Sequence, residues 1–194
     1  MKKKYDIVMF GAPGAGKGTH AEILAQKYDF RHLSTGCLLR SEVASGSKLG
    51  EKLQGIRDRG ELVDDEIVMQ IIENEIEKDY NGFIFDGYPR TVTQAKRLDE
   101  LLEQHGRHLD IVVALDVEQD ELVRRMLERA TIEQRSDDNE QSFKRRQEEY
   151  AEHTLPVLKY YESRGLLVHV DAGGDKETTQ QHIIEALNKA WPTD

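Results

Sequence analysis

Short apolar runs alternate along the chain with longer stretches in which apolar residues recur at helical spacing. The runs are apolar or nearly so, which is typical of strands that are covered on both faces of a parallel sheet. They occupy residues 5–10, 31–34, 82–86, 110–117 and 166–171. Helical patterns cover residues 17–28, 36–45, 47–59, 64–79, 91–104, 119–129, 139–163 and 176–190. This alternation predicts an α/β fold with five parallel strands between two layers of helices.

Two segments do not follow the alternation of strand and helix. Residues 34–63 contain helical patterns with no strand between them, and they are interrupted near Gly46 and Gly50. Residues 130–138, "ATIEQRSDD", are polar and lie between two predicted helices. We expect both segments to leave the sheet, as lids and substrate clamps commonly do.

The composition fits one globular domain of 194 residues, with 33% charged and 7% aromatic residues. The first eleven residues hold only four consecutive apolar ones, so we expect no secretory segment there. No run approaches the roughly 20 apolar residues of a membrane span. The single cysteine, Cys37, excludes an internal disulfide and a cysteine-rich zinc site. These features predict a cytoplasmic protein that has no membrane partner.

The formal net charge of -10 argues against nucleic acid as a partner, because nucleic-acid binding needs a basic field. A smaller anion still fits if cations gather locally. They do so between residues 124 and 146, as Arg124, Arg125, Arg129, Arg135, Lys144, Arg145 and Arg146. For Arg124, Lys144 and Arg145 a solvated helix surface is the preferred interpretation.

The stretch "GAPGAGKGT", residues 11–19, follows the first predicted strand and opens the first predicted helix. Its glycines let backbone N–H groups turn toward an anion, and the helix N-terminus adds its positive end. Lys17 would reach the β- and γ-phosphates of a nucleotide. The general pattern has Ser or Thr directly after the lysine, but here Gly18 follows and the hydroxyl arrives at Thr19.

This loop resembles that of adenylate kinases and related nucleoside monophosphate kinases, in which glycine normally follows the lysine. The resemblance covers nearly the whole chain. It includes "LSTGCLLRSEVASGS" (33–47), "GELV" (60–63), "DGYPRTVTQA" (86–95), "LERATIEQRSDDN" (127–139), "FKRRQEEY" (143–150) and "VDAGG" (170–174). It implies a single P-loop domain of three α/β/α layers, with a core of residues 1–33, 64–128 and 140–194. A helical insertion at 34–63 would bind the monophosphate, and 129–139 would form a short lid.

The implied reaction is the reversible, Mg-dependent transfer of the γ-phosphoryl group of ATP to AMP, giving two ADP and balancing adenine nucleotides. The acceptor phosphate has a second pKa near ~6, so it is already ionised and needs no general base. The reaction does need positive charge around the transferring group. The resemblance implies Mg with ATP as the cofactor. The seven histidines show no metal spacing, and zinc is not expected.

The resemblance also implies which residues take part. For ATP they are Gly14, Ala15, Gly16, Lys17, Gly18, Thr19, Arg125, Arg129 and Gly174. For AMP they are Thr35, Gly36, Arg40, Glu61, Leu62, Val63, Gly87, Tyr88, Pro89, Arg90, Gln94, Arg135 and Arg146. The catalytic set is Lys17, Arg90, Arg129, Arg135 and Arg146. Asp86, at a strand end, would hold Mg²⁺ through water.

Two residues bear on the acceptor base. Relatives that act on UMP or CMP tend to have Ala and Asn at the positions of Thr35 and Gln94. The amide of Gln94 offers a donor and an acceptor together, which match the N6 and N1 edge of adenine. AMP is therefore the expected acceptor, with a UMP/CMP-type kinase as the alternative.

Two departures from the family pattern affect the expected activity. Cys37 stands where the family usually has Asp, which predicts reduced but real turnover and leaves a weakened nucleotide-binding relative as a further alternative. "TIEQR" replaces the Ser-Gly that often precedes the lid arginine, which would fit a stiffer lid. The short lid resembles that of monomeric relatives, so we expect a monomer.

Overall fold

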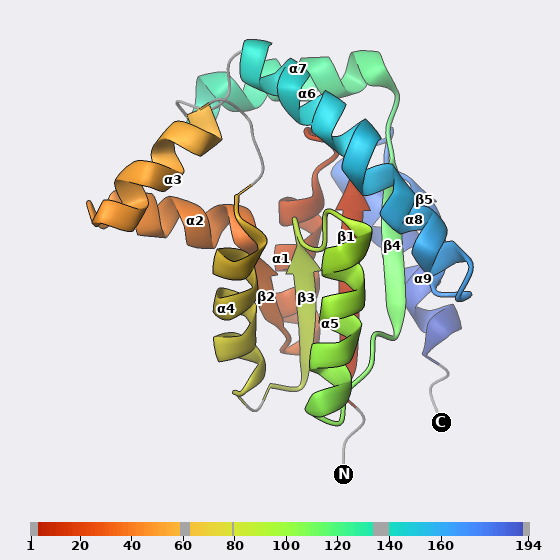
Figure 1. The fold of residues 1–194 in the computed structure, drawn as a ribbon. Helices are drawn as coiled ribbons and strands as arrows, with labels where there is room; N and C mark the ends of the chain where they lie inside the picture. The colour runs from red at the N-terminus through yellow and green to blue at the C-terminus, as the bar shows by residue number, and fades with distance from the viewer. Residues whose placement is uncertain (1–3, 59–62, 79, 134–139, 192–194) are drawn as a thin grey trace.

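The computed structural model describes residues 4–58, 63–78, 80–133 and 140–191. Its centre is one sheet of five parallel strands in the order β2-β3-β1-β4-β5 (Figure 1). The strands are β1 (Tyr5–Gly11), β2 (Arg31–Ser34), β3 (Gly82–Asp86), β4 (Ile111–Asp116) and β5 (Leu167–Asp171). All five predicted strands are confirmed, each to within one residue at either end.

Helices cover both faces of the sheet and confirm the predicted three-layer α/β fold (Figure 1). They are α1 (Lys17–Tyr28), α2 (Thr35–Ala44), α3 (Lys48–Asp58), α4 (Asp65–Ile76), α5 (Val92–Gln104), α6 (Gln119–Glu133), α7 (Glu140–Glu149), α8 (Leu155–Glu162) and α9 (Lys176–Ala190). Within the described ranges, no helix combines the length and apolarity needed to cross a bilayer.

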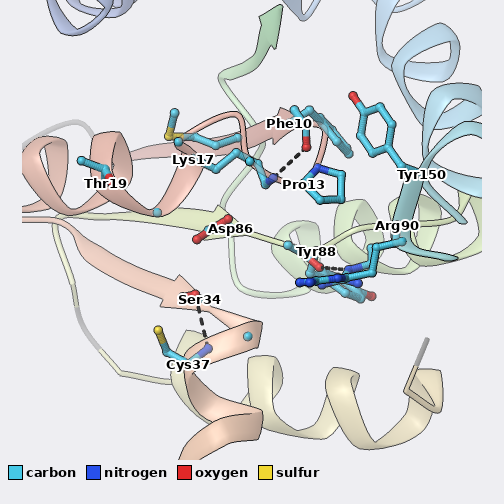
Figure 2. Close-up of a pocket in the computed structure, with 18 of the residues that line it drawn as sticks. Phe10, Pro13, Lys17, Thr19, Ser34, Cys37, Asp86, Tyr88, Arg90 and Tyr150 are labelled. Atoms are coloured by element: carbon cyan, nitrogen blue, oxygen red, sulfur yellow. Dashed lines mark hydrogen bonds between the residues drawn. The ribbon is translucent and has the colours of Figure 1, made fainter. Parts of the chain in front are cut away.

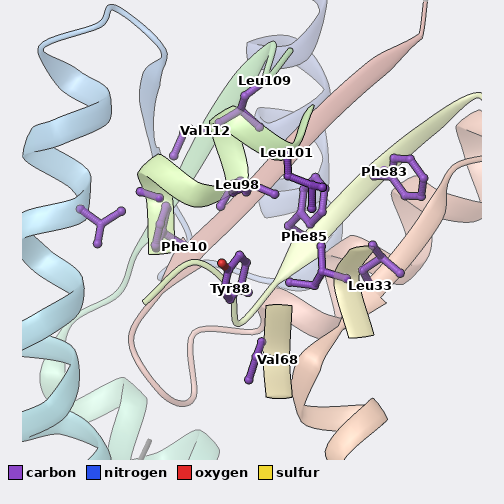
Figure 3. Packing of buried hydrophobic residues seen from close by; sticks show 14 of the residues in the cluster. Phe10, Leu33, Val68, Phe83, Phe85, Tyr88, Leu98, Leu101, Leu109 and Val112 are labelled. Carbon is purple, nitrogen blue, oxygen red and sulfur yellow. The ribbon is translucent and has the colours of Figure 1, made fainter. Parts of the chain in front are cut away.

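Alternate residues of the strands feed two separate cores, as the two-residue period of a strand requires. Val8 and Phe10 of β1 face a cluster that includes Leu98 of α5 and Val157 of α8 (Figure 3). Their neighbours on β1, such as Ile7, belong to a second cluster on the opposite face, which α1, α6 and α9 cover. The sheet is thus buried on both sides, and binding groups collect where its strands end.

The segment that was predicted to leave the sheet contains α2 and α3, with no strand between them (Figure 1). The two helices approach so closely at Gly50 that a Cβ there would lie 2.5 Å from the backbone oxygen of Glu42. A glycine is therefore required at this contact. The break that the sequence showed near Gly50 is a packing contact between the first turn of α3 and the last turn of α2.

Two helical predictions were wrong in detail. The pattern over 139–163 predicted one helix, but the chain forms α7, a π-helical turn η1 (Tyr150–Thr154) and then α8. A π-turn inserts an extra residue and re-aims the side chains that follow, a feature often found at functional sites. Helix α6 was expected to end at residue 129, but it continues to Glu133, into the predicted lid. Residues 134–139 of that lid lie outside the described part of the chain.

Candidate active site

A cavity of about 740 Å³ opens at the carboxyl edge of the sheet. The register places Ser34 of β2 and Met9 of β1 beside Asp86 of β3, so three strands end at the same edge. The strand order changes direction at β1, and ligands of doubly wound sheets bind at such a switch point. Figure 2 shows Lys17, Asp86 and Arg90 around this cavity, with Tyr150 on the side of Arg90.

The loop between β1 and α1 forms one wall of the cavity. Gly14 and Gly16 have φ angles of 96° and 89°, in the left-handed region that favours glycine. Gly16 also precedes the first turn of α1 without any side-chain cap. The backbone N–H groups of that turn are the donors that a phosphate takes at a helix N-terminus. Gly18 and Thr19 line the cavity as well, whereas Ala15 is fully buried inside the loop.

Lys17 lies across this loop. Its Nζ donates to the backbone oxygen of Gly11 at 2.7 Å and to that of Ala12 at 3.3 Å. Figure 2 shows Lys17 with one of these hydrogen bonds. Its positive charge also acts on Asp86 across the cavity. Lys17 therefore stands at the meeting point of the loop and the strand-end carboxylate, where a polyphosphate would add a stronger anionic partner.

Asp86 is part of a chain of three side chains. His32 places Nε2 3.3 Å from Asp86 Oδ2 and Nδ1 3.3 Å from Glu22 Oε2. Burial tends to lower the pKa of His32, but the two carboxylates outweigh burial and raise it. Burial tends to raise the pKa of Asp86, but the hydrogen bond from His32 and the charges of Lys17 and His32 hold it below its ordinary value. Asp86 is thus an ionised carboxylate fixed beside the phosphate loop.

Arginines form the opposite wall. Arg90 follows β3, and its Nε donates to the backbone oxygen of Gly87 at 2.7 Å, while Thr154 of η1 donates to the Arg90 backbone oxygen at 3.2 Å. Burial lowers the pKa of the Arg90 guanidinium, and the nearby charge of Arg146 lowers it further. The charges of Asp86 and Glu149 act in the opposite direction and raise this pKa. Two cations held this close favour the binding of an anion between them.

Arg40 of α2 completes this wall. Its guanidinium donates to Cys37 Sγ at 2.9 Å, one turn back on the same helix, and both residues line the cavity. Gly36, Gly87, Tyr88 and Pro89 of the predicted acceptor site line the cavity too. Cys37 thus occupies the place beside Arg40 where a carboxylate would form an ion pair.

Arg125 ties α6 to the loop after β5. It donates to Glu121 Oε1 at 2.6 Å and to the backbone oxygens of Ala172 at 2.9 Å and Gly174 at 3.2 Å. Arg125 lines the cavity, whereas Gly174 does not. This arrangement holds the loop that the resemblance places near the ATP base.

The remaining predicted residues are not gathered at the cavity. Thr35, Val63 and Gln94 are buried and do not line it. The Thr35 hydroxyl donates to the backbone oxygen of Asp86 at 3.3 Å. The described part of the chain does not include Glu61, Leu62 or Arg135. It also leaves out the side chain of Arg129.

The sequence analysis missed several residues that line the cavity, namely Glu22, His32, Glu149, Tyr150 and Thr154. His32 could have been found, because it lies near the end of a predicted strand and such ends share one edge of a parallel sheet. Tyr150 and Thr154 belong to the π-turn, for which the sequence gives no local signal.

A phosphate loop after the central strand of a parallel sheet, facing a wall of arginines across one cavity, defines a P-loop phosphotransferase that acts on nucleotides. The family model described as adenylate kinase matches residues 9–166 of the chain. The chain belongs to the adenylate kinase family.

Proteins of that name are similar to it over nearly their whole length. The adenylate kinase of Thermus thermophilus is 47% identical over 181 residues, which cover 93% of this chain and 96% of that protein. That of Thermobifida fusca is 45% identical over 183 residues, 93% and 97% of the two chains. That of Xanthomonas euvesicatoria pv. vesicatoria is 46% identical over 185 residues, 94% and 99%.

Proposed function

We propose that this protein transfers the γ-phosphoryl group of ATP to AMP, reversibly, and so keeps adenine nucleotides in balance. The observation that carries the proposal is the single cavity with the Lys17 loop on one wall and Arg40, Arg90 and Arg146 on the other. A donor and an acceptor phosphate can meet there end to end. Family membership supports the same reaction.

The proposed chemistry needs cations and no general base. A phosphate oxygen of AMP attacks the γ-phosphorus of ATP, and the bond from that phosphorus to the β-phosphate oxygen breaks, leaving two ADP. The acceptor phosphate is ionised near neutral pH, since its second pKa is about 6. Lys17, Arg90 and Arg146 would neutralise the charge that spreads over the transferring group. Arg129 and Arg135 are proposed to join them from a lid at 129–139 that excludes water when it closes.

The two nucleotide sites divide along the two walls. We assign the ATP phosphates to residues 14–19, and the ATP base to the Arg125 and Gly174 region. We assign the AMP phosphate to Arg40 and Arg90, and the AMP base to Thr35, Gln94 and residues 61–63. Residues 34–63 would then act as the monophosphate-binding segment.

The residues present fit a magnesium ion that arrives with ATP. Mg²⁺ usually keeps several waters and takes one or two carboxylates together with phosphate oxygens. Asp86 supplies one ionised carboxylate beside Gly18 and Thr19. The bound ion would neutralise phosphate charge, and Asp86 would orient its water shell.

A coupled assay tests the proposal with ATP and Mg²⁺ against AMP, CMP, UMP and GMP in turn. We expect ADP formation with AMP to exceed that with the other acceptors. Preference for UMP or CMP would replace the proposal with a pyrimidine acceptor. Tight ATP binding without turnover on any acceptor would point to the weakened relative that Cys37 allows.

A second measurement tests the shared cavity directly. Two adenosines joined through five phosphates should compete with both ATP and AMP, because the ligand occupies both walls at once. Its affinity should fall in both Lys17→Met and Arg90→Lys. Competition against one substrate alone would contradict the end-to-end arrangement. We also propose a monomer in the cytoplasm, and a solution mass near 22.3 kDa would agree with the first point.

A further inference from the structure

We infer that Asp65 sets the choice of acceptor base by fixing the orientation of the Gln94 side-chain amide. The inference deepens the proposed function and rests on its assignment of Gln94 to the AMP base. Asp65 is the first residue of α4 and Gln94 the third of α5, so the pair joins two helices on one face of the sheet (Figure 1). Asp65 would be a positioning residue that does not touch the nucleotide.

The Gln94 amide is held from both of its ends. Its Nε2 donates to Asp65 Oδ1 at 2.5 Å, and its Oε1 accepts from the Arg90 backbone N–H at 2.5 Å. The backbone of Gln94 is fixed too, because its N–H donates to the capping Thr91 Oγ1 at 3.2 Å and its oxygen accepts from Tyr88. With 3% of its surface exposed, the residue has little freedom to change rotamer.

Each of the two hydrogen-bond partners of this amide can act in only one role, as acceptor or as donor. A carboxylate accepts hydrogen bonds, and a backbone N–H donates one. An amide turned by 180° would place its oxygen against the carboxylate of Asp65 and its NH₂ group against the Arg90 N–H. Both contacts would then be repulsive. The side-chain amide orientation, which is often ambiguous in proteins, is therefore determined here by chemistry.

This fixed orientation determines which base edge the amide can pair with. An amide has two N–H donors and two lone pairs, and the described contacts use one of each. The other N–H and lone pair match adenine, which accepts at N1 and donates from N6. A 6-oxopurine such as hypoxanthine donates from N1 and accepts at O6, so it would need the amide reversed. Asp65 and the Arg90 N–H together therefore disfavour 6-oxopurine monophosphates.

The test compares kcat/KM for AMP and for IMP in Asp65→Asn. An Asn at this position can donate as well as accept, so it removes one of the two repulsive contacts of the reversed amide and leaves the one with the Arg90 N–H. We expect the ratio of AMP to IMP efficiency to fall on the order of ten-fold, mainly through KM, since one mispaired buried group costs roughly 1–3 kcal/mol. Asp65→Ser, whose hydroxyl also works in both directions, should shift the ratio the same way if Asp65→Asn folds poorly.

Asp64→Asn is the matched control. It removes the same charge one residue away, where Asp64 is exposed and caps α4 by accepting from the Glu66 N–H at 2.9 Å. Asn caps a helix about as well as Asp, so the helix start should survive. The AMP to IMP ratio should stay at its wild-type value in this variant.

Gln94→Leu separates the inference from the proposal beneath it. If Gln94→Leu lowers the ratio and Asp65→Asn does not, the amide contacts the base without help from Asp65 and the inference is wrong. If neither variant changes the ratio, the assignment of Gln94 itself fails. Equal losses for AMP and IMP in Asp65→Asn would reduce the contact to a structural tie between α4 and α5. With Asp65→Asn added to Gln94→Leu, we expect no further change in the ratio.

Discussion

The donor and acceptor walls of the cavity are built in different ways. The donor wall is one continuous stretch, residues 11–19, between the central strand and the helix that follows it. The acceptor wall is formed by Arg40 of α2, Arg90 of the segment between β3 and α5, and Arg146 of α7. The first is shaped by its own backbone and the second by the packing of distant elements.

This difference predicts that damage to each wall has a different effect. A change in the loop distorts the backbone donors that grip ATP in the ground state and in the transition state alike. A change in an acceptor arginine alters a side chain whose position depends on several other elements. Interactions made in both states affect binding, whereas those that strengthen in the transition state affect kcat. The variants below test this division.

Arg90→Lys should have the largest effect. Lysine keeps the charge but cannot make the forked contacts of a guanidinium to phosphate. We expect kcat to fall on the order of 10²–10³-fold, the loss seen when one preorganised charge-stabilising donor is removed, with the Kd for ATP within about two-fold of wild type. Stopped-flow turnover and equilibrium ATP binding measure the two quantities.

The matched control for this prediction is Arg124→Lys. Arg124 lies on the outer surface of α6, where it contacts Glu121 and Glu128, and it does not line the cavity. The same replacement there should leave both kcat and ATP affinity unchanged. Equal losses of ATP affinity and of kcat in Arg90→Lys would show that the two walls do not divide binding and transfer.

Gly14→Ala should come next and should weaken ATP binding. Gly14 has a φ of 96°, and a Cβ there would meet the backbone oxygen of Leu122 at 2.9 Å. Backbone strain of this kind costs about 1–3 kcal/mol, so we expect ATP affinity to fall roughly 5- to 150-fold. AMP affinity should change little. Calorimetric titration with each nucleotide measures both.

Gly106→Ala is the control, because it also places alanine at a positive φ but lies outside the phosphate loop. Gly106 has a φ of 65° but open space around its Cβ position, and it follows α5 far from the cavity. It should lower stability slightly and leave ATP affinity intact. Loss of AMP affinity in Gly14→Ala as large as the loss for ATP would remove the distinction between a local donor wall and an assembled acceptor wall.

The same contrast explains how much could be predicted from sequence. The loop at 11–19 is a contiguous pattern whose strand-to-helix setting is visible in the apolar spacing, so its geometry followed from residues alone. The meeting of Arg40 and Arg90 was expected only through the family resemblance, because helical spacing does not place α2 beside β3. The π-turn at 150–154 had no signal, since its residues fit an ordinary helix. Thr35 and Gln94, which were expected to contact the acceptor base, are buried and do not line the cavity, so that contact stays a prediction.

Cys37→Asp should have a moderate effect, in the direction of gain. The Arg40 guanidinium now donates to a weakly accepting thiol at 2.9 Å, whereas a carboxylate would accept a charge-assisted hydrogen bond. We expect Arg40 to be better fixed and kcat to rise roughly 3- to 10-fold, since hydrogen bonds to charged groups contribute about 1.5–3 kcal/mol and part of that is lost to solvent exposure. Initial rates across a Mg²⁺ series measure the change.

Cys37→Ser controls for loss of the thiol alone and should leave kcat near its wild-type value. If kcat rises as much in the serine variant as in the aspartate variant, loss of the thiol causes the gain and the charge of the aspartate does not. If Cys37→Asp changes neither kcat nor the Mg²⁺ dependence, this position of the acceptor wall does not limit the reaction.

The smallest expected effect is on the pH dependence of protein stability, through a buried histidine of α1, the helix that follows the donor wall. His20 lies in the first turns of α1, is 5% exposed, and places Nδ1 2.8 Å from Gln180 Oε1 of α9. Burial lowers the pKa of His20, and the charges of Lys176 and Arg125 lower it further. The hydrogen bond with Gln180 raises the pKa but does not outweigh them. Protonation of His20 therefore favours the unfolded chain, and its effect is to reduce stability as pH falls below about 6.5, the ordinary histidine pKa.

His20→Gln removes this titration and keeps a polar side chain that can bond to Gln180. The drop in Tm between pH 7.5 and pH 5.5 should be smaller in this variant than in wild type, by no more than roughly 2–4 °C, the shift that about 1 kcal/mol produces in a chain of this size. His182→Gln, on the exposed side of the same helix α9, should leave that drop unchanged. A drop as large in His20→Gln as in wild type would mean that the imidazole behind the loop is already solvated. The rigidity of the donor wall would then depend less on water-free packing of α1 against α9 and more on the backbone conformation of the glycines in the loop.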